Sequence, residues 1–166
     1  MIILGLDPGS RFTGYGLIHQ EGSRLRHIDN GLIVLTDYET LAERLKHLFE
    51  KVTSIIDEFK PTAAAIENVF YSKNVASTIK LSHARGVLMA ACGIKGLKVS
   101  EFTPLEVKKA VVGYGGASKD QVQKMVRVLL NLPAIAEENA SDALAVALCQ
   151  SQGLGLNALL LKQGMR

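Results

Sequence analysis

The sequence predicts an α/β domain whose core is a five-stranded mixed sheet flanked by helices. Three apolar, strand-like runs follow one another at residues 2–6, about 12–19 and about 24–35, a pattern typical of an antiparallel meander. Beyond these runs, amphipathic helical segments alternate with short apolar strands, as they do in α/β folds. The 166 residues are enough for one domain with a sizeable buried core.

Turn and capping residues mark the element boundaries in the first half of the chain. Pro-Gly at 8–9 and Glu-Gly-Ser at 21–23 separate the first three strands. Thr36 and Glu39 have the Thr-x-x-Glu spacing of a capping box, so we expect the first helix to start there and to stop at Pro61. Apolar residues three and four apart between these limits predict that the helix is amphipathic.

The second half alternates the same two kinds of element. The predicted order is a buried strand at 63–66, a helix at about 75–92 closed by Gly93, a strand at 97–102, two short helices capped by Thr103–Glu106 and Ser118–Gln121, and a last apolar helix at about 139–152. We expect residues 1–155 to form a single domain and residues 156–166 to form a flexible C-terminal tail.

Composition favours a globular protein of a reducing compartment. Hydrophobic residues make up 48% of the chain and charged residues 21%, and no apolar segment has the length of a membrane span. The N-terminus lacks a basic and apolar leader, so we expect a cytoplasmic location and no membrane partner. Cys92 and Cys149 lie in apolar helical patterns and are expected to be small buried residues. The four histidines lack the spacing of metal ligands.

Charge is distributed unevenly along the chain. Residues 73–127 contain ten Lys or Arg against three Asp or Glu, whereas the remainder contains nine against thirteen. A basic segment on an acidic remainder suggests a polyanionic partner such as nucleic acid. Ordinary solvated helix faces explain the same distribution equally well.

Three acidic residues stand at the ends of apolar elements. Asp7 ends the first strand, Glu67 ends the fourth, and Asp142 lies in the first turn of the last helix. If those two strands are parallel neighbours, their side chains emerge together at the carboxyl edge of the sheet, where α/β sheets place their sites. Converging carboxylates repel one another unless cations neutralise them. Oxygen ligands without Cys or His favour Mg²⁺ or Mn²⁺, and two such ions can promote phosphodiester cleavage.

Each carboxylate also has a structural explanation. Asp7 could cap its own Asp-Pro-Gly turn, Glu67 could pair with a lysine, and Asp142 could favour the positive end of its helix. The occurrence of three such acidic residues, each beside apolar sequence, favours one shared metal site over three separate structural roles.

Four motifs run in order along nearly the whole chain. They are LGLDPGS-x-x-TGYG, IENVFYSKN with LSHARG, TPLEVKKAVVGYGGASKDQVQKMV, and NASDALAVAL. Together they resemble the RuvC family of bacterial Holliday-junction resolvases. The resemblance implies a ribonuclease-H-like nuclease domain, a homodimer, and symmetric metal-dependent nicking of four-way DNA junctions during recombination and repair. It also implies the RuvA–RuvB branch-migration complex as a partner.

The resemblance places Asp7, Glu67 and Asp142 on three of the family's four metal-binding positions, with a catalytic role and two Mg²⁺ (or Mn²⁺) ions per site. The fourth position is Asn139, where the family has Asp or, in some members, His. Its carbonyl oxygen can bind Mg²⁺ and shares a helix face with Asp142, but it carries no charge. We therefore expect weaker metal binding, and weakened or absent activity, in this chain. The acidic residues at 137–138 are expected to point elsewhere.

The predicted DNA surface combines aromatic and basic residues. By resemblance, Phe70 matches the aromatic that stacks on unpaired bases at the junction centre, and Lys108 and Lys119 match basic positions near the scissile phosphate. Further predicted contacts, for which solvated surface is nearly as good an explanation, are Tyr71, Lys73, Lys80, Arg85 and Lys109. The 75–92 helix has apolar residues on more than one face, so we expect it to join two subunits.

Three other functions remain open. An actin-like or sugar-kinase ATPase has a similar first turn but needs two copies of the fold, and this chain has room for one. A nuclease for RNA–DNA hybrids shares the fold class, although the aromatic after Glu67 and the basic 73–127 segment favour junction DNA. The third is a module that binds junctions without cleaving them, which stays open because the neutral Asn139 occupies a metal-binding position.

Overall fold

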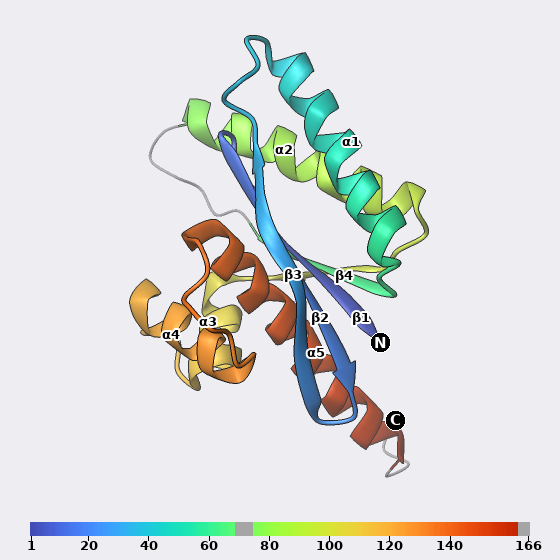
Figure 1. Ribbon diagram of the computed structural model, residues 1–166, viewed down its shortest axis with the longest axis vertical. Coiled ribbons are helices and arrows are strands. Elements are labelled where there is room, and N and C mark those ends of the chain that lie inside the picture. The colour runs from blue at the N-terminus through green and yellow to red at the C-terminus, as the bar shows by residue number, and fades with distance from the viewer. Residues whose placement is uncertain (69–74, 163–166) are drawn as a thin grey trace.

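The computed structural model describes residues 1–68 and 75–162, and its core is one mixed five-stranded sheet. The strands are β1 (Ile2–Asp7), β2 (Phe12–Glu21), β3 (Arg24–Val34), β4 (Ala63–Glu67) and β5 (Val99–Phe102). Their order across the sheet is β3-β2-β1-β4-β5 (Figure 1). The first three strands are antiparallel, whereas β4 runs parallel to both of its neighbours, so the predicted meander and mixed sheet are confirmed.

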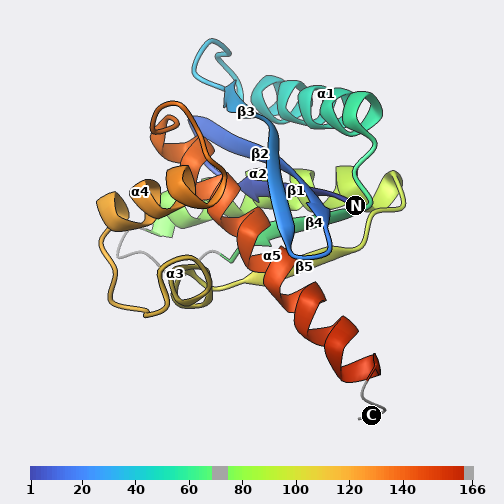
Figure 2. The ribbon, with the colours of Figure 1, turned by 60° about the horizontal axis from the view of Figure 1, so that its bottom comes forward.

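Helices cover both faces of this sheet. Those in the described part of the chain are α1 (Leu41–Phe59), α2 (Val75–Ile94), α3 (Pro104–Val112), α4 (Lys119–Leu129) and α5 (Glu138–Lys162). The pair α1 and α2 packs on one face, and α5 lies across the other with α3 and α4 beside it (Figures 1 and 2). The molecule is therefore a three-layer α/β structure with two apolar cores.

Strand β1 contributes to both cores because successive side chains point to opposite faces. Leu4 and Leu6 pack against α1 and α2, whereas Ile3 packs against α5, and all three side chains are completely buried. Each contributes about 1.5–3 kcal/mol of hydrophobic stabilisation. This burial fixes β1 at the centre of the sheet and with it the position of the Asp7 carboxylate.

Helix α5 lies unusually close to the sheet because glycines face it. A side chain at Gly5 would collide with the carbonyl oxygen of Ala143, and one at Gly14 would collide with that of Asn139. The absence of a Cβ at these positions therefore lets the first turns of α5 rest directly on β1 and β2. This contact brings Asp142 to the end of β1.

The start predicted for the first helix is wrong by one turn. Helix α1 begins at Leu41, and its capping box joins Thr40 to Glu43, not Thr36 to Glu39. The Thr-x-x-Glu spacing occurs twice in succession, and the backbone N–H of Leu35 donates to the Arg11 carbonyl at 2.9 Å, which keeps the chain extended before the helix. The predicted capping boxes of α3 and α4 are confirmed.

Two helices run past glycines that were expected to end them. Helix α2 continues through Gly93 and ends at Ile94, and the chain turns at Gly96, which has φ of 72°. Helix α5 ends at Lys162 instead of about residue 152. Glycine inside a helix costs about 1 kcal/mol but stops it only where a left-handed conformation is adopted.

Both cysteines are free and buried, as predicted. No helix in the described ranges combines the length and apolar character needed to cross a bilayer.

Candidate active site

The parallel pairing of β1 and β4 brings Asp7 and Glu67 together. Leu6 lies opposite Ile66 in this pair, so the two acidic residues that follow leave the sheet side by side. Asp142 reaches the same edge from the start of α5, and its side chain is only 19% exposed. The convergence predicted from the strand ends is therefore present in the structure.

The three carboxylates share one poorly solvated environment. Burial, followed by repulsion from Glu67 and Asp142, raises the pKa of Asp7 to about 8. Burial, followed by repulsion from Asp142, raises the pKa of Glu67 to about 7. Burial also raises the pKa of Asp142, although Lys119 opposes that shift. The metal-free site thus favours protons or cations over three separate negative charges.

The structural explanations for Asp7 and Glu67 are disfavoured by their contacts. A capping Asp7 would accept the N–H of Gly9, but this N–H donates instead to the Thr13 hydroxyl at 3.3 Å. The Thr13 hydroxyl in turn donates to the Gly9 carbonyl at 3.2 Å, so the turn is fixed without the carboxylate. For Glu67, no ion pair joins it to any Lys or Arg in the described residues.

Lys119 is a cation in direct contact with the acidic residues. Its Nζ lies 2.6 Å from Oε1 of Glu138 and 3.4 Å from Oδ2 of Asp142. The hydrogen bond to Glu138, followed by attraction to Asp142, raises the pKa of Lys119 to about 12. Its ammonium group therefore neutralises one side of the site.

A cleft of about 290 Å³ opens beside these groups. Its lining residues are Glu67, Pro104, Val107, Lys108, Lys119, Val122, Asp142 and Ala145. Two acidic and two basic side chains thus face one cavity with an apolar floor. This arrangement can bring a phosphate close to carboxylate-bound cations while limiting access of bulk water.

Asn139 is held by a neighbour that the sequence did not indicate. Its Nδ2 donates to Oε1 of Glu137 at 3.0 Å, while the N–H groups of Asn139 and Ala140 donate to Oε2. Because the amide nitrogen is engaged, the Asn139 carbonyl oxygen is the atom left to act as a ligand. Glu137 is also close enough to raise the pKa of Asp7 and of Asp142.

The expectation that residues 137 and 138 point away from the site is therefore wrong. Helix α5 begins at Glu138, so Glu137 precedes the helix and its side chain folds back over the first turn. Glu138 reaches across to Lys119 on another helix. A carboxylate just before a helix is the signal that could have identified Glu137 as a cap.

The donor set fits a hard divalent cation. Carboxylate and amide oxygens without thiolates or imidazoles are the ligands of Mg²⁺ and Mn²⁺. Within residues 1–68 and 75–162, no three His, Cys, Asp or Glu side chains are yet close enough to share one ion.

The other predicted DNA contacts are spread over the surface. Lys108 lines the cleft, Lys109 is exposed on α3, and Lys80 lines a separate groove near the start of α2. Arg85 donates to the Glu101 carboxylate, which balances its charge. Three predicted contacts, Phe70, Tyr71 and Lys73, lie outside the described residues.

Comparison with known proteins identifies the family. The sequence matches the family model described as crossover junction endodeoxyribonuclease RuvC over residues 3–150. The crossover junction endodeoxyribonuclease RuvC of Syntrophotalea carbinolica is 55% identical over 160 residues, which cover 96% of this chain and 99% of that protein. The corresponding protein of Geotalea uraniireducens is 52% identical over 160 residues, covering 96% of this chain and 94% of the relative.

Solved structures agree with this assignment. RuvC of T. thermophilus in complex with Holliday junction substrate superposes with a TM-score of 0.90 at 28% identity, covering 95% of this chain and 96% of that one. The yeast mitochondrial Holliday junction resolvase, at 14% identity and a TM-score of 0.66, covers 93% of this chain and 82% of its own and shares the fold alone. The expected ribonuclease-H-like fold is thereby confirmed. The chain belongs to the RuvC family of crossover junction endodeoxyribonucleases.

Proposed function

We propose that the protein is a structure-selective endodeoxyribonuclease that resolves four-way DNA junctions by paired, symmetric nicks during recombination and repair. The observation that carries this proposal is the convergence of Asp7, Glu67 and Asp142, of which Glu67 and Asp142 line one cleft with Lys108 and Lys119. Relatives named as crossover junction endodeoxyribonucleases support it, as does the similar structure bound to a Holliday junction.

We infer that Asp7, Glu67 and Asp142 hold two Mg²⁺ ions, with Mn²⁺ as an alternative, and that the Asn139 carbonyl oxygen completes the set. The chemistry supplied by such ions is activation of a water and stabilisation of the leaving oxygen. The rigid ends of β1 and β4 fix two of the ligands, and α5 fixes the other two. The neutral amide provides one negative charge fewer than the family's usual Asp, so we expect weaker metal binding and activity that requires a higher metal concentration.

Lys108 and Lys119 are proposed to hold the scissile phosphate in the cleft. Lys119 is bound more closely to Glu138 than to Asp142, so it can leave Asp142 without losing its anchor. Its ammonium group then remains at the rim, where a phosphate enters. Phe70 is proposed to stack against an unpaired base, and Tyr71 and Lys73 are proposed as further DNA contacts. Lys109 is a proposed backbone contact, and the ion-paired Arg85 a weaker one.

A homodimer joined through α2 is the proposed assembly. Val75, Ile79 and Ile94 are 65%, 51% and 71% exposed on this helix, whereas Leu88 faces the core. Gly86 and Gly93 have open space where a side chain would stand, which allows a second helix to approach closely. Two cleavage sites related by a two-fold axis match the two-fold symmetry of a four-way junction.

The remaining assignments follow from the family. We propose residues 1–155 as the nuclease domain, a cytoplasmic location, and the RuvA–RuvB branch-migration complex as a partner. Of the tail expected at 156–166, the residues up to Lys162 continue helix α5.

The decisive experiment incubates the protein with an end-labelled four-way junction in EDTA, Mg²⁺ or Mn²⁺ and maps cuts on all four strands. We expect metal-dependent cuts at symmetric positions of two opposing strands. A linear duplex of the same sequence is the matched DNA control, and Asp142→Asn is the matched protein control. Binding without cleavage would identify a junction-binding module, and equal cleavage of an RNA–DNA hybrid would identify a hybrid nuclease. ATP hydrolysis by the protein would instead identify an ATPase.

A further inference from the structure

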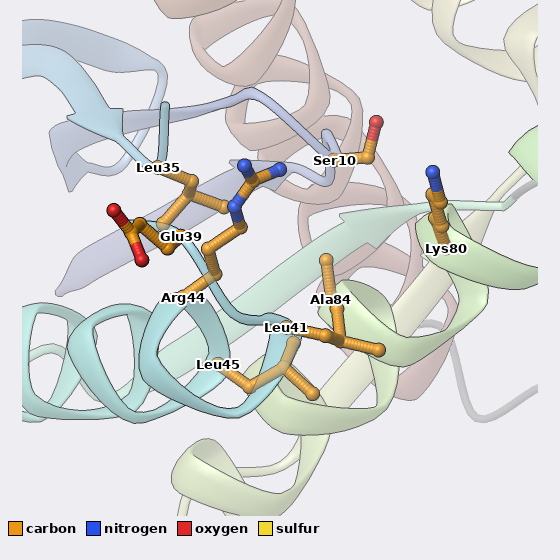
Figure 3. Close-up of a pocket in the computed structure, with 8 residues that line it drawn as sticks. All are labelled: Ser10, Leu35, Glu39, Leu41, Arg44, Leu45, Lys80 and Ala84. Atoms are coloured by element: carbon orange, nitrogen blue, oxygen red, sulfur yellow. The ribbon is translucent and has the colours of Figure 1, made fainter. Parts of the chain in front are cut away.

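A second groove, separate from the acidic cleft, lies where the β1–β2 turn meets the starts of α1 and α2. Its volume is about 450 Å³. We call it the arm groove; its lining residues are Ser10, Arg11, Thr36, Arg44, Ser77 and Lys80. Three of these side chains are cationic and three carry hydroxyl groups. The neighbouring hollow of about 220 Å³ shares Ser10, Arg44 and Lys80 with it (Figure 3).

The positive charges of the arm groove come from three different elements. Arg11 lies in the β1–β2 turn, Arg44 on α1 and Lys80 on α2. None of the three forms an ion pair with any residue that the structure describes. Unpaired cations gathered from separate elements repel one another, so a bound anion would stabilise this arrangement.

Arg44 is positioned for an external partner. Its Nε donates to the Tyr38 carbonyl at 2.8 Å, which fixes the side chain and leaves the terminal nitrogens of the guanidinium group available. In Figure 3 the guanidinium group points toward Ser10, and Lys80 stands on the far side of Ser10. Glu39 lies on the opposite side of Arg44 from both (Figure 3).

Among the described residues, no acidic side chain lines the arm groove; Glu39 lines the neighbouring hollow instead. Asp37 accepts the Thr36 hydroxyl at 3.3 Å, and Glu39 belongs to the same β3–α1 loop. The β1–β2 turn and the start of α2 contribute cations and hydroxyl groups to the lining. A DNA strand, with phosphates at regular intervals along its backbone, would fit a surface lined by cations and hydroxyl groups.

The arm groove is rigidly connected to the acidic cleft. Asp7 ends β1, and Ser10 and Arg11 follow in the turn that the buried Thr13 hydroxyl holds through Gly9. The Arg11 carbonyl accepts the N–H of Leu35 at the end of β3. The two sites therefore lie on either side of one fixed turn.

We propose that the arm groove binds backbone phosphates of the junction arm that leads away from the cleavage site. This inference rests on the proposed function. Arg11, Arg44 and Lys80 hold the phosphates by charge, and the lining hydroxyl groups supply additional donors. We expect this contact to be independent of base sequence, because phosphates carry no sequence information. It sets the direction in which the arm leaves the enzyme.

The test compares Arg44→Ala, Lys80→Ala and the double variant with wild type. Dissociation constants for a four-way junction are measured in EDTA over a series of NaCl concentrations, so that no cleavage occurs. Each single variant should reduce the slope of log Kd against log salt by about one, and the double variant by about two. Lys46→Ala is the matched control, because this exposed lysine on α1 pairs with Glu50 outside the groove. Its slope should equal that of wild type.

Two further measurements separate the possible outcomes. Arg44→Lys should restore the slope, because lysine keeps the positive charge that a phosphate contact requires. Slopes for Arg44→Ala and Lys80→Ala equal to the Lys46→Ala slope would overturn the arm groove, even if wild type cuts junctions normally. A wild type that binds but does not cut would overturn the proposed cleavage while the slopes still report on the groove. Thermal melts confirm that each variant is folded.

Discussion

Replacing Asp7 by Asn should stabilise the metal-free protein while abolishing cleavage, the combination expected of a metal ligand. In the folded chain, burial and then repulsion from Glu67 and Asp142 raise the pKa of Asp7 from 3.8 to about 8. An unfolded chain releases this proton near its ordinary pKa, so between these two values the folded state holds more protons. By linkage, the free energy of unfolding of the metal-free protein falls as pH rises through this window.

The magnitude follows from the width of the window. At 1.36 kcal/mol for each tenfold change in proton affinity, the whole interval corresponds to about 6 kcal/mol. This value is an upper bound, because the Asp7 side chain is half-buried and Lys119 lies near it. We expect Asp7→Asn to gain about 2–3 kcal/mol at pH 8, or roughly 5–10 °C in melting temperature for a domain of this size.

Thermal melts in EDTA at pH 5 and pH 8 measure this effect directly. The melting temperature of Asp7→Asn should exceed that of wild type by a margin that widens toward pH 8. Junction affinity in EDTA should be retained, whereas cleavage in Mg²⁺ should be lost. A variant that melts below wild type at both pH values would show that Asp7 stabilises its turn, and one that still cuts junctions would refute the metal-site assignment.

Three further predictions concern other parts of the molecule. Asn139→Asp should increase cleavage at limiting Mg²⁺, although the new carboxylate loses the side-chain hydrogen bond to Glu137 and is repelled by it. Adding Glu137→Gln to this variant should relieve the repulsion. If Asn139→Asp increases cleavage neither alone nor with Glu137→Gln, residue 139 is not a metal ligand. Ile79→Asp should convert the dimer to a monomer in sedimentation, whereas a monomeric wild type would remove the proposed interface. Phe70→Ala should lower junction cleavage far more than duplex binding, and equal losses would make Phe70 a structural residue.

The sequence predicted the fold and the three carboxylates because both depend on strong local signals. Apolar strand runs determined which segments enter the sheet, and the carboxyl ends of parallel strands have to meet at one edge. Asp7 and Glu67 could therefore be placed together on the condition that the first and fourth strands are parallel neighbours, as they are in the structure. In the structure, β1 and β4 pair with Leu6 opposite Ile66, which brings the following residues, Asp7 and Glu67, to the same level of the sheet.

Boundaries set by tertiary contacts were less predictable. Two consecutive Thr-x-x-Glu patterns can cap α1, and the hydrogen bond between Leu35 and Arg11 selects the second by keeping the preceding chain on the sheet. The sequence alone does not show whether Gly93 or the glycines of α5 adopt the left-handed conformation that would end a helix. The arm groove was missed for a similar reason, since Arg11, Arg44 and Lys80 are far apart along the chain.

The charges around the cleft explain why acidic residues can be gathered there before metal binds. Asp7 and Glu67 hold protons more tightly than usual, and the Lys119 ammonium group neutralises part of Asp142. In the proposed metal site, divalent ions would therefore compete with protons and with Lys119 for the same oxygens. Because Nζ of Lys119 lies 2.6 Å from Glu138, against 3.4 Å from Asp142, the ammonium group would keep its contact with Glu138 if it left Asp142. We infer that its positive charge would then be available to a bound phosphate.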